Sequence, residues 1–319
     1  MGKIIRFAFI RFNMRILLKY IHSPFLIIAD EHTLGTIRPL INIGSILLTK
    51  DKPQILLTND DGFDSPGLWA AAEALSEIGF VWVTAPRDQA SGMGRSMPST
   101  SDGRIATRKM EVHGKEWTVY AVGGTPAQTV QHAVLEIMPE KPDLVVSGIN
   151  YGSNMGIGVT ISGTVGAALE GAAYKIPSIA VSLDTADEYH LSHSDEIDFE
   201  PAAQITVKFA SRYLQSQMPD DVQAFKIEVP ADATAETPWQ ISSLSREQFY
   251  ISTAPQRESW DEEITTGYRV ADDLSVFPEG SDVHTVHHKG LVAVTPLSLD
   301  LTSRVDLKAL EKQLHATGN

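Results

Sequence analysis

The sequence predicts an α/β protein with a Rossmann-like, mainly parallel sheet flanked by helices, followed by a β-rich C-terminal subdomain or dimerisation arm. From Lys52 onward, short apolar runs alternate with helical patterns, which is typical of βαβ units. Several of these runs end abruptly in polar or glycine-rich segments, as parallel strands do at the carboxyl edge of a sheet. Beyond about Asp184 the alternation weakens and short β runs take its place.

The predicted elements follow in order along the chain. The apolar run 54–58 is the first strand, and Pro66 suits the first turn of a helix that ends near Ile78. Residues 80–85 form the second strand, which Pro86 closes. The remaining core elements expected are β runs at 104–112 and 116–122 joined as a hairpin, a helix from Thr125, a strand at 143–147, a helix at 163–174 and a strand at 178–183. The second half is expected to hold a helix at 201–217 and β runs at 225–229, 248–252, 265–270 and 291–295.

Charge is unevenly distributed along the chain. The 319 residues include 26 Lys or Arg and 40 Asp or Glu, a net charge of −14, yet residues 1–50 hold seven of the basic residues and only two acidic ones. An Arg-rich, acid-poor start resembles an organellar transit peptide, but a non-native or misassigned start is the favoured interpretation. We therefore expect residues 1–50 to be an extension outside the fold. Residues 51–319 are expected to form the functional domain, with a core at about 53–185 and oligomerisation elements at about 186–302.

Composition argues against several classes of function. The negative charge disfavours a nucleic-acid polymer as partner, because binding a phosphate backbone needs a basic face. There are no cysteines, so disulfides, thiolate catalysis and zinc–sulfur sites are excluded. The apolar stretch at residues 16–28 is interrupted by Lys19, His22 and Pro24 and is too short to span a membrane. We expect a cytoplasmic protein, without a membrane or nucleic-acid partner, that acts on a small molecule.

Oxygen-bearing side chains follow three of the predicted strands. Asp60 and Asp61 come directly after the first strand, Ser91 follows the second, and Asn150 follows the strand at 143–147. These loops converge in a doubly wound sheet, and an oxygen-only ligand set suits Mg²⁺, Mn²⁺ or Ca²⁺. Taken alone, an Asp pair after a strand is more often a turn or helix cap, and Asn150 suits a turn. Their joint occurrence at three strand ends favours a metal site.

A glycine-rich segment points to an anion. Glycines recur between Gly148 and Gly158, and Ser162-Gly163-Thr164 directly precedes a helix, where free N–H groups bind phosphate. Capping of that helix is the alternative role of Ser162 or Thr164. A Walker A loop is absent, as is G-x-G-x-x-G after the first strand, which disfavours an NTPase or an NAD enzyme.

An aspartyl-phosphate mechanism is also disfavoured. That chemistry needs a nucleophilic Asp with a second Asp two residues later. Here Asn59 stands two residues before Asp61, and Gly62 stands two residues after Asp60, so neither register fits.

The order of motifs resembles the SurE survival-protein nucleotidases over about residues 53–302. The matching motifs are Thr58-Asn59-Asp60-Asp61-Gly62 with Pro66-Gly67, Ala85-Pro86 with Ser91-Gly92, Gly124-Thr125-Pro126, the run from Lys141 to Asn150, Ser162-Gly163-Thr164-Val165 with Glu170-Gly171, the run from Ile176 to Ala180, Ser281-Asp282-Val283, and Val294-Thr295-Pro296-Leu297. The chain departs from the family at Tyr151, where His is common, at Ile157-Gly158, where acidic residues are common, and at Ile161, where Tyr is common. These departures bear on substrate preference.

The resemblance implies a divalent-metal-dependent 5′-nucleotidase that hydrolyses nucleoside 5′- and 3′-monophosphates. It implies one Mg²⁺ or Mn²⁺ per subunit and a homodimer or homotetramer with exchanged C-terminal elements. The metal ligands it implies are Asp60, Asp61, Ser91 and Asn150. The substrate-binding residues it implies are Gly92, Asn154, Ser162, Gly163 and Thr164.

The mechanism we expect from these residues is attack by a metal-activated water, without a covalent intermediate. Asp60 and Asp61 would anchor the ion, and one of them would accept the water's proton. Asn59, together with the substrate-binding residues, would orient the phosphoryl oxygens. Two alternatives remain open: a non-catalytic stress protein that binds a nucleotide or metal, and a hydrolase of another phosphorylated substrate such as short polyphosphate.

Overall fold

The computed structural model describes residues 52–112, 114–186, 189–190, 194 and 196–317. Residues 1–51 lie outside the described residues. The predicted N-terminal extension therefore remains a prediction.

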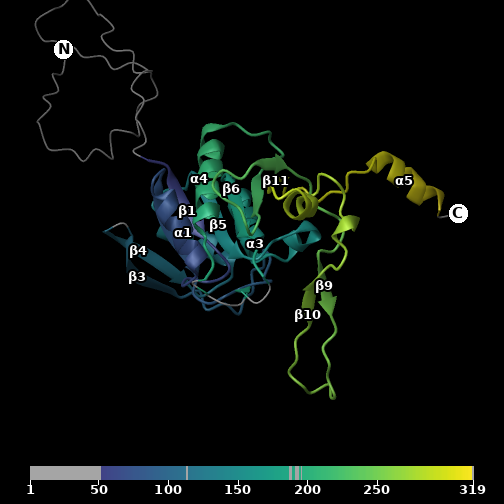
Figure 1. The fold of residues 1–319 in the computed structure, drawn as a ribbon, viewed down its shortest axis with the longest axis horizontal. Coiled ribbons are helices and arrows are strands. Elements are labelled where there is room, and N and C mark those ends of the chain that lie inside the picture. The colour runs from purple at the N-terminus through teal and green to yellow at the C-terminus, as the bar shows by residue number, and fades with distance from the viewer. Residues whose placement is uncertain (1–51, 113, 187–188, 191–193, 195, 318–319) are drawn as a thin grey trace, which may run out of the picture. The chain divides into compact units, whose positions relative to one another are not determined.

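A nine-stranded sheet forms the centre of the described chain, in the order β3-β4-β2-β1-β5-β6-β7-β11-β8 (Figure 1). The central neighbours from β4 to β7 pair in parallel, while β3 against β4 and β7 against β11 are antiparallel. The strands are β1 Gln54–Thr58, β2 Phe80–Pro86, β3 Ile105–Val112, β4 Lys115–Val122, β5 Leu144–Tyr151, β6 Ser178–Leu183, β7 Ala224–Val229, β8 Trp239–Ile241 and β11 Val292–Leu297. The sheet confirms the predicted α/β, Rossmann-like fold with a mainly parallel sheet.

Helices cover both faces of the sheet. Successive side chains of β1 point to opposite faces, so they contact different pairs of helices. Ile55 and Leu57 lie in one buried cluster with residues of α1 and α4, whereas Leu56 lies in another with residues of α2 and α3. All three side chains are fully buried, as expected for a central parallel strand. The helices are α1 Pro66–Leu75, α2 Pro126–His132, α3 Gly163–Ala173, α4 Glu200–Gln215 and α5 Leu307–Ala316.

Local sequence signals explain where the helices begin. Thr125 and Gln128 form a capping box at the start of α2, in which the Gln128 N–H donates to Thr125 Oγ1 at 3.2 Å and Gln128 Oε1 accepts from the Thr125 N–H at 3.1 Å. Gly171 allows α3 to lie close to the sheet, since a Cβ there would stand 2.6 Å from Ser178 Oγ. α2 continues into a short π-helical segment at Ala133–Ile137.

The C-terminal half differs from the expected division. The sequence placed the end of the core near residue 185, but β7, β8 and β11 all belong to the main sheet. A separate antiparallel pair, β9 Tyr250–Thr253 with β10 Gly267–Val270, forms the arm, which extends away from the sheet in Figure 1. α5 was not predicted, and none of its residues is buried.

No helix among the described residues is both long and apolar enough to cross a membrane.

Candidate active site at the carboxyl edge of the sheet

The structure brings three predicted loops together beyond the carboxyl ends of β1, β2 and β5. The Ala90 N–H donates to the backbone oxygen of Asp60 at 2.7 Å, which joins the loop after β2 to the loop after β1. The Tyr151 N–H donates to Asp61 Oδ2 at 3.2 Å, which brings in the end of β5. β5 extends four residues beyond its predicted end, with a register shift against β6 between Ser147 and Asn150. The convergence inferred from the order of the strands is therefore present.

Asp60 is buried against the first turn of α3. The Thr164 hydroxyl donates to its Oδ1 at 2.5 Å. Burial raises the pKa of Asp60 to about 6, opposed by the Thr164 hydroxyl and by backbone N–H groups, including those of Thr164 and Gly163. Gly163 permits this close approach, since a Cβ there would lie 2.8 Å from the Asp60 carboxylate. The sequence predicted that an anion binds at the N-terminus of α3, and in the structure the Asp60 carboxylate lies there.

Asp61 is buried beside Asp60 and carries the same charge. Burial raises the pKa of Asp61 well above its usual range, and the charge of Asp60 raises it further. The Tyr151 N–H and the Gln89 side chain act in the opposite direction. Gln89 was missed at the sequence level; its one signal was its position in the polar loop two residues before Ser91.

In both Asn150 and Asn59, the side-chain nitrogen donates to backbone oxygens, which leaves the side-chain oxygen as an acceptor. Asn150 Nδ2 donates to the backbone oxygens of Tyr151 at 3.0 Å and Gly152 at 2.7 Å, so its Oδ1 remains the acceptor. Asn59 Nδ2 donates to the Gly62 oxygen at 2.9 Å, while its buried Oδ1 has no hydrogen-bond partner. A buried oxygen without a partner is unfavourable unless a ligand supplies one.

Ser91 lies at the exposed end of the loop after β2, where its Oγ accepts from Gln89 Nε2 at 3.2 Å. It directly follows Ala90, the residue bonded to Asp60.

These donors fit a hard divalent cation. A divalent cation, which prefers oxygen ligands, would offset the two buried carboxylates and supply a partner for the Asn59 amide oxygen. Within the described residues, no three His, Asp or Glu side chains gather as a metal site. The predicted ligand set differs from such a cluster, because it combines two carboxylates with one hydroxyl and one amide.

The predicted phosphate-side residues divide into two groups. Ser162, Gly163 and Thr164 lie at the start of α3 beside Asp60, and Ser162 Oγ also caps the helix by accepting from the Val165 N–H at 3.1 Å. Both predicted roles of Ser162 thus remain compatible. Gly92 is exposed, with φ of +75° and space around it for a Cβ. The Asn154 side chain donates instead to Ser182 Oγ on β6, at 2.8 Å.

A buried charged cluster behind Asn154 was missed from the sequence as a site feature. It consists of Lys226 and Glu228 on β7 and Asp282, all with 0% exposure. Two charged residues at alternate positions of a predicted strand normally indicate a solvent-facing side, so the pattern gave no signal of burial.

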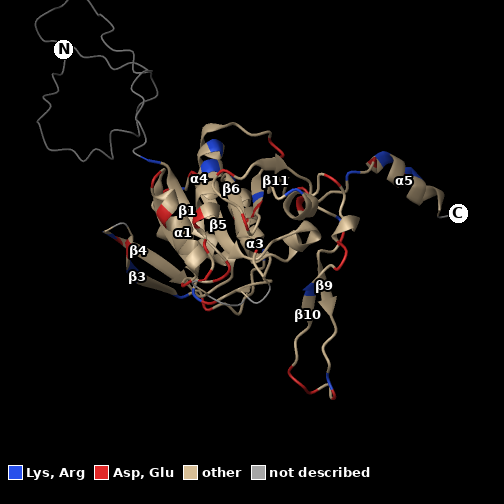
Figure 2. Cartoon of the chain, viewed as in Figure 1, with Lys and Arg blue, Asp and Glu red and all other residues tan. Residues whose placement is uncertain are grey.

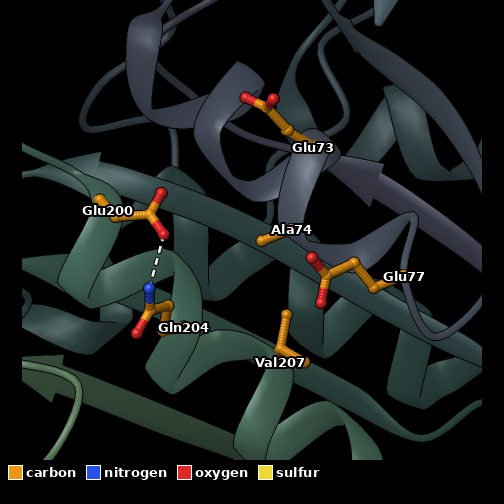
Figure 3. Close-up of a pocket in the computed structure, with 6 residues that line it drawn as sticks. All are labelled: Glu73, Ala74, Glu77, Glu200, Gln204 and Val207. Atoms are coloured by element: carbon orange, nitrogen blue, oxygen red, sulfur yellow. Dashed lines mark hydrogen bonds between the residues drawn. The ribbon is translucent and has the colours of Figure 1, made fainter. Parts of the chain in front are cut away.

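Charged residues of both signs recur along the described ribbon, as Figure 2 shows. A pocket of about 330 Å³ lies between α1 and α4, and Figure 3 shows its lining. Three glutamates dominate it, Glu73, Glu77 and Glu200, and the last accepts from Gln204 Nε2 at 2.6 Å. None of the predicted site residues lines this pocket, so we do not assign the candidate active site to it.

The fold and this edge define a Rossmann-like α/β protein with a carboxylate site suited to a hard cation. A family model described as survival protein SurE matches residues 55–250. The 5′-nucleotidase SurE of Methanosarcina acetivorans is 40% identical over 273 residues, covering 82% of this chain and 98% of that protein. That of Thermococcus gammatolerans is 37% identical over 262 residues, covering 82% and 96%. The crystal structure of SurE protein from Aquifex aeolicus has a TM-score of 0.65 at 31% identity, covering 83% of this chain and 100% of that one. The chain belongs to the SurE family.

Proposed function

We propose that this chain is a divalent-metal-dependent phosphomonoesterase that hydrolyses nucleoside 5′- and 3′-monophosphates to nucleoside and phosphate. The observation that carries the proposal is the buried pair Asp60 and Asp61 at the N-terminus of α3. The relatives named 5′-nucleotidase SurE support the same reaction. A nucleotide phosphate is the anion that such a helix end and a cation together accommodate.

Asp60, Asp61, Ser91 and Asn150 would hold one Mg²⁺ or Mn²⁺ per subunit. When bound, such an ion polarises the phosphoryl group and lowers the pKa of water. Asp60 and Asp61 keep their carboxylates in place through Thr164 and the Tyr151 N–H, and one of them takes the proton of the attacking water.

The phosphoryl oxygens would be oriented by Asn59, Gly92, Asn154 and the Ser162-Gly163-Thr164 segment. Their contribution would be positioning and charge stabilisation through backbone N–H groups and side-chain donors. Beside this segment, Ile157 and Ile161 are 42% and 63% exposed. These two apolar side chains bear on which leaving group the site prefers.

A homodimer or homotetramer is the assembly we propose. α5 shows an apolar stripe of Leu307, Leu310 and Leu314, each at least 40% exposed, and Trp260 on the arm is 91% exposed. Exposed apolar surface of this kind marks contact with another subunit. Light scattering of the purified chain tests this, and a monomer at micromolar concentration contradicts it. We also place the protein in the cytoplasm, in line with its lack of cysteine, and cell fractionation checks this.

The reaction is tested by phosphate release from a panel of nucleoside monophosphates, short polyphosphate and a sugar phosphate, with Mn²⁺, with Mg²⁺ and with a chelator. We expect metal-dependent release from nucleoside monophosphates. Release from polyphosphate alone would favour the other hydrolase, and no release from any ester would favour a binding protein.

The matched variants are Asp60→Asn and, as the control, Asp220→Asn in an exposed turn. Asp60→Asn should lower kcat/KM at least about 100-fold, as loss of a group that stabilises transition-state charge does. An Asp60→Asn protein as active as the control, or activity that survives chelation, would contradict the mechanism.

A further inference from the structure

Three fully buried charged side chains lie together beneath the glycine-rich segment. Lys226 Nζ stands 2.8 Å from Asp282 Oδ2 and 3.3 Å from Glu228 Oε1. Lys226 and Glu228 project from β7, and Asp282 comes from a segment more than fifty residues further along the chain. Burying charges is unfavourable unless they are paired and hydrogen-bonded. Here one ammonium is paired with two carboxylates, and Glu228 Oε1 has no hydrogen-bond partner among the described residues.

Each member of the cluster also bonds the backbone of residues 154–156. Lys226 Nζ donates to the Asn154 oxygen at 2.8 Å, and the Asn154 N–H donates to Glu228 Oε2 at 3.0 Å. The Gly156 N–H donates to Asp282 Oδ2 at 2.8 Å. One short segment therefore uses all three charges as its hydrogen-bond partners.

The segment needs such anchors because its own sequence does not restrain it. Gly152 and Gly156 have φ of +83° and +52°, in a region that glycine enters freely. The same segment joins Asn150, on the metal side of the candidate site, to Ser162 at the start of α3. A shift of its backbone would move the Asn154 side chain, whose amide already donates to Ser182 Oγ.

Asp282 extends the connection into the C-terminal part of the chain. Its Oδ1 accepts from the Ser245 and Val283 N–H groups, both at 3.0 Å. The carboxylate thus joins three chain segments, of which only one lies in the predicted core.

We propose that Lys226, Glu228 and Asp282 form a positioning cluster that fixes the backbone from Asn154 to Gly156 and thereby directs the Asn154 amide toward the phosphate of the substrate. This rests on the proposed function, because it assigns Asn154 to the phosphate. The three residues are positioning residues, since they act through the backbone of the segment. Stability alone does not require charges here, because well-packed apolar residues often replace a buried ion pair without loss.

The test compares the wild-type protein with Lys226→Met/Asp282→Asn, which removes one positive and one negative charge and leaves Glu228 as the remaining buried acid of the cluster. Its matched control is Lys109→Met/Glu116→Gln, the same exchange at an exposed pair on the β3–β4 hairpin with an Nζ–Oε1 distance of 3.0 Å. Three quantities are measured on the full chain: amide hydrogen exchange at Asn154 and Gly156, Mn²⁺ affinity, and inhibition by inorganic phosphate in the nucleotidase assay.

We expect the cluster variant to lose exchange protection at Gly156 and to bind inorganic phosphate at least about tenfold more weakly, the effect of one lost charge-assisted hydrogen bond. Its Mn²⁺ affinity should stay within about twofold of the wild type, because Asp60 and Asp61 are untouched; the control should match the wild type in all three. Glu228→Gln, which keeps an acceptor for the Asn154 N–H, should retain phosphate affinity.

Unchanged protection at Gly156, or unchanged phosphate affinity despite lost protection, would overturn the proposal. So would equal losses of Mn²⁺ and phosphate affinity, which indicate general damage to the fold. Exchange protection does not depend on turnover. A wild-type protein without phosphatase activity would therefore contradict the proposed function, while the protection data would still decide whether the cluster fixes the segment.

Discussion

Two groups of buried acids occupy this fold, and they differ in where their counter-charge comes from. Lys226 lies against Glu228 and Asp282, so that cluster contains its own cation. At the carboxyl edge, the neighbouring charge that acts on Asp61 is the negative charge of Asp60. The first group takes its counter-charge from the chain, whereas the second is suited to receive a cation from solution.

The pKa directions express the same difference. Burial alone would raise the pKa of Asp282, but the Lys226 ammonium outweighs it and holds that pKa below its usual range. Burial likewise opposes the charge on Lys226, yet the two carboxylates raise its pKa. At Asp60 burial prevails and raises the pKa to about 6. The internal cation thus keeps Asp282 ionised, but it does not do so for Glu228, whose pKa burial raises to about 7.

The largest effect should come from removing the internal cation alone. Lys226→Met leaves Asp282 and Glu228 buried without Lys226, and breaking a buried pair from one side costs about 3–5 kcal/mol of unfolding free energy. Urea denaturation of the variant and of Lys109→Met measures this. A Lys226→Met protein as stable as the control would show that the two groups are not distinguished by an internal cation.

The pH dependence of stability should identify Glu228 as the cluster's weaker acid. Burial raises the pKa of Glu228 from 4.5 to about 7, despite the charge of Lys226. The folded state therefore binds the proton more tightly than the unfolded state, and this group's contribution to stability is present below pH 4.5 and lost as pH rises toward 7. Glu228→Gln does not titrate, so its unfolding free energy should gain on the wild type across that range, by at most about 3 kcal/mol. Parallel pH curves for the two proteins would contradict the prediction.

Added metal should stabilise the carboxyl edge of the sheet, where Asp60 and Asp61 are expected to bind it. We expect Mn²⁺ at about 100 times its Kd to raise the unfolding free energy by about 2.7 kcal/mol. The shift in Tm by calorimetry should vanish in Asp60→Asn and persist in Lys226→Met/Asp282→Asn. Equal shifts in both variants would place the metal elsewhere.

A smaller effect is expected from the hydroxyl that orients Asp60. Thr164→Val removes the 2.5 Å hydrogen bond to Asp60 Oδ1 while keeping the shape of the side chain. A hydrogen bond to a charged group contributes about 1.5–3 kcal/mol, and we expect the free energy of Mn²⁺ binding to weaken by that amount. Titration calorimetry measures it, with Thr107→Val on exposed β3 as the control. An unchanged Mn²⁺ affinity would exclude Thr164 from the support of the site.

Much of the fold could be predicted from local signals. The apolar run before Asp60, the Thr125-Pro126 helix start and the hairpin after Val112 each depend on neighbouring residues. The hairpin differs from the predicted one in that Lys115 belongs to the second strand and pairs with Val112. For the same reason the loops after β1, β2 and β5 could be assigned to one edge. The parallel sheet order follows from alternating strands and helices.

The remaining features depend on contacts that are distant in sequence. Lys226 and Glu228 resemble the solvent-facing residues of a half-buried strand until Asp282 is placed beside them. Membership of β7 in the main sheet depends on its pairing with β6, which no short window contains. No residue of α5 is buried within the described chain. A helix without a buried face cannot be assigned from its contacts with a core.

The two outermost strands of the sheet have a consequence for how these molecules can associate. β3 presents exposed Arg108 and Lys109 along its length, and β8 is only three residues long, with Arg212 5.3 Å from the Trp239 ring. Charged and very short terminal strands resist the addition of a further strand from another chain. Both ends of the nine-stranded sheet therefore disfavour strand-by-strand aggregation, which leaves ordered contact between copies to other parts of the molecule.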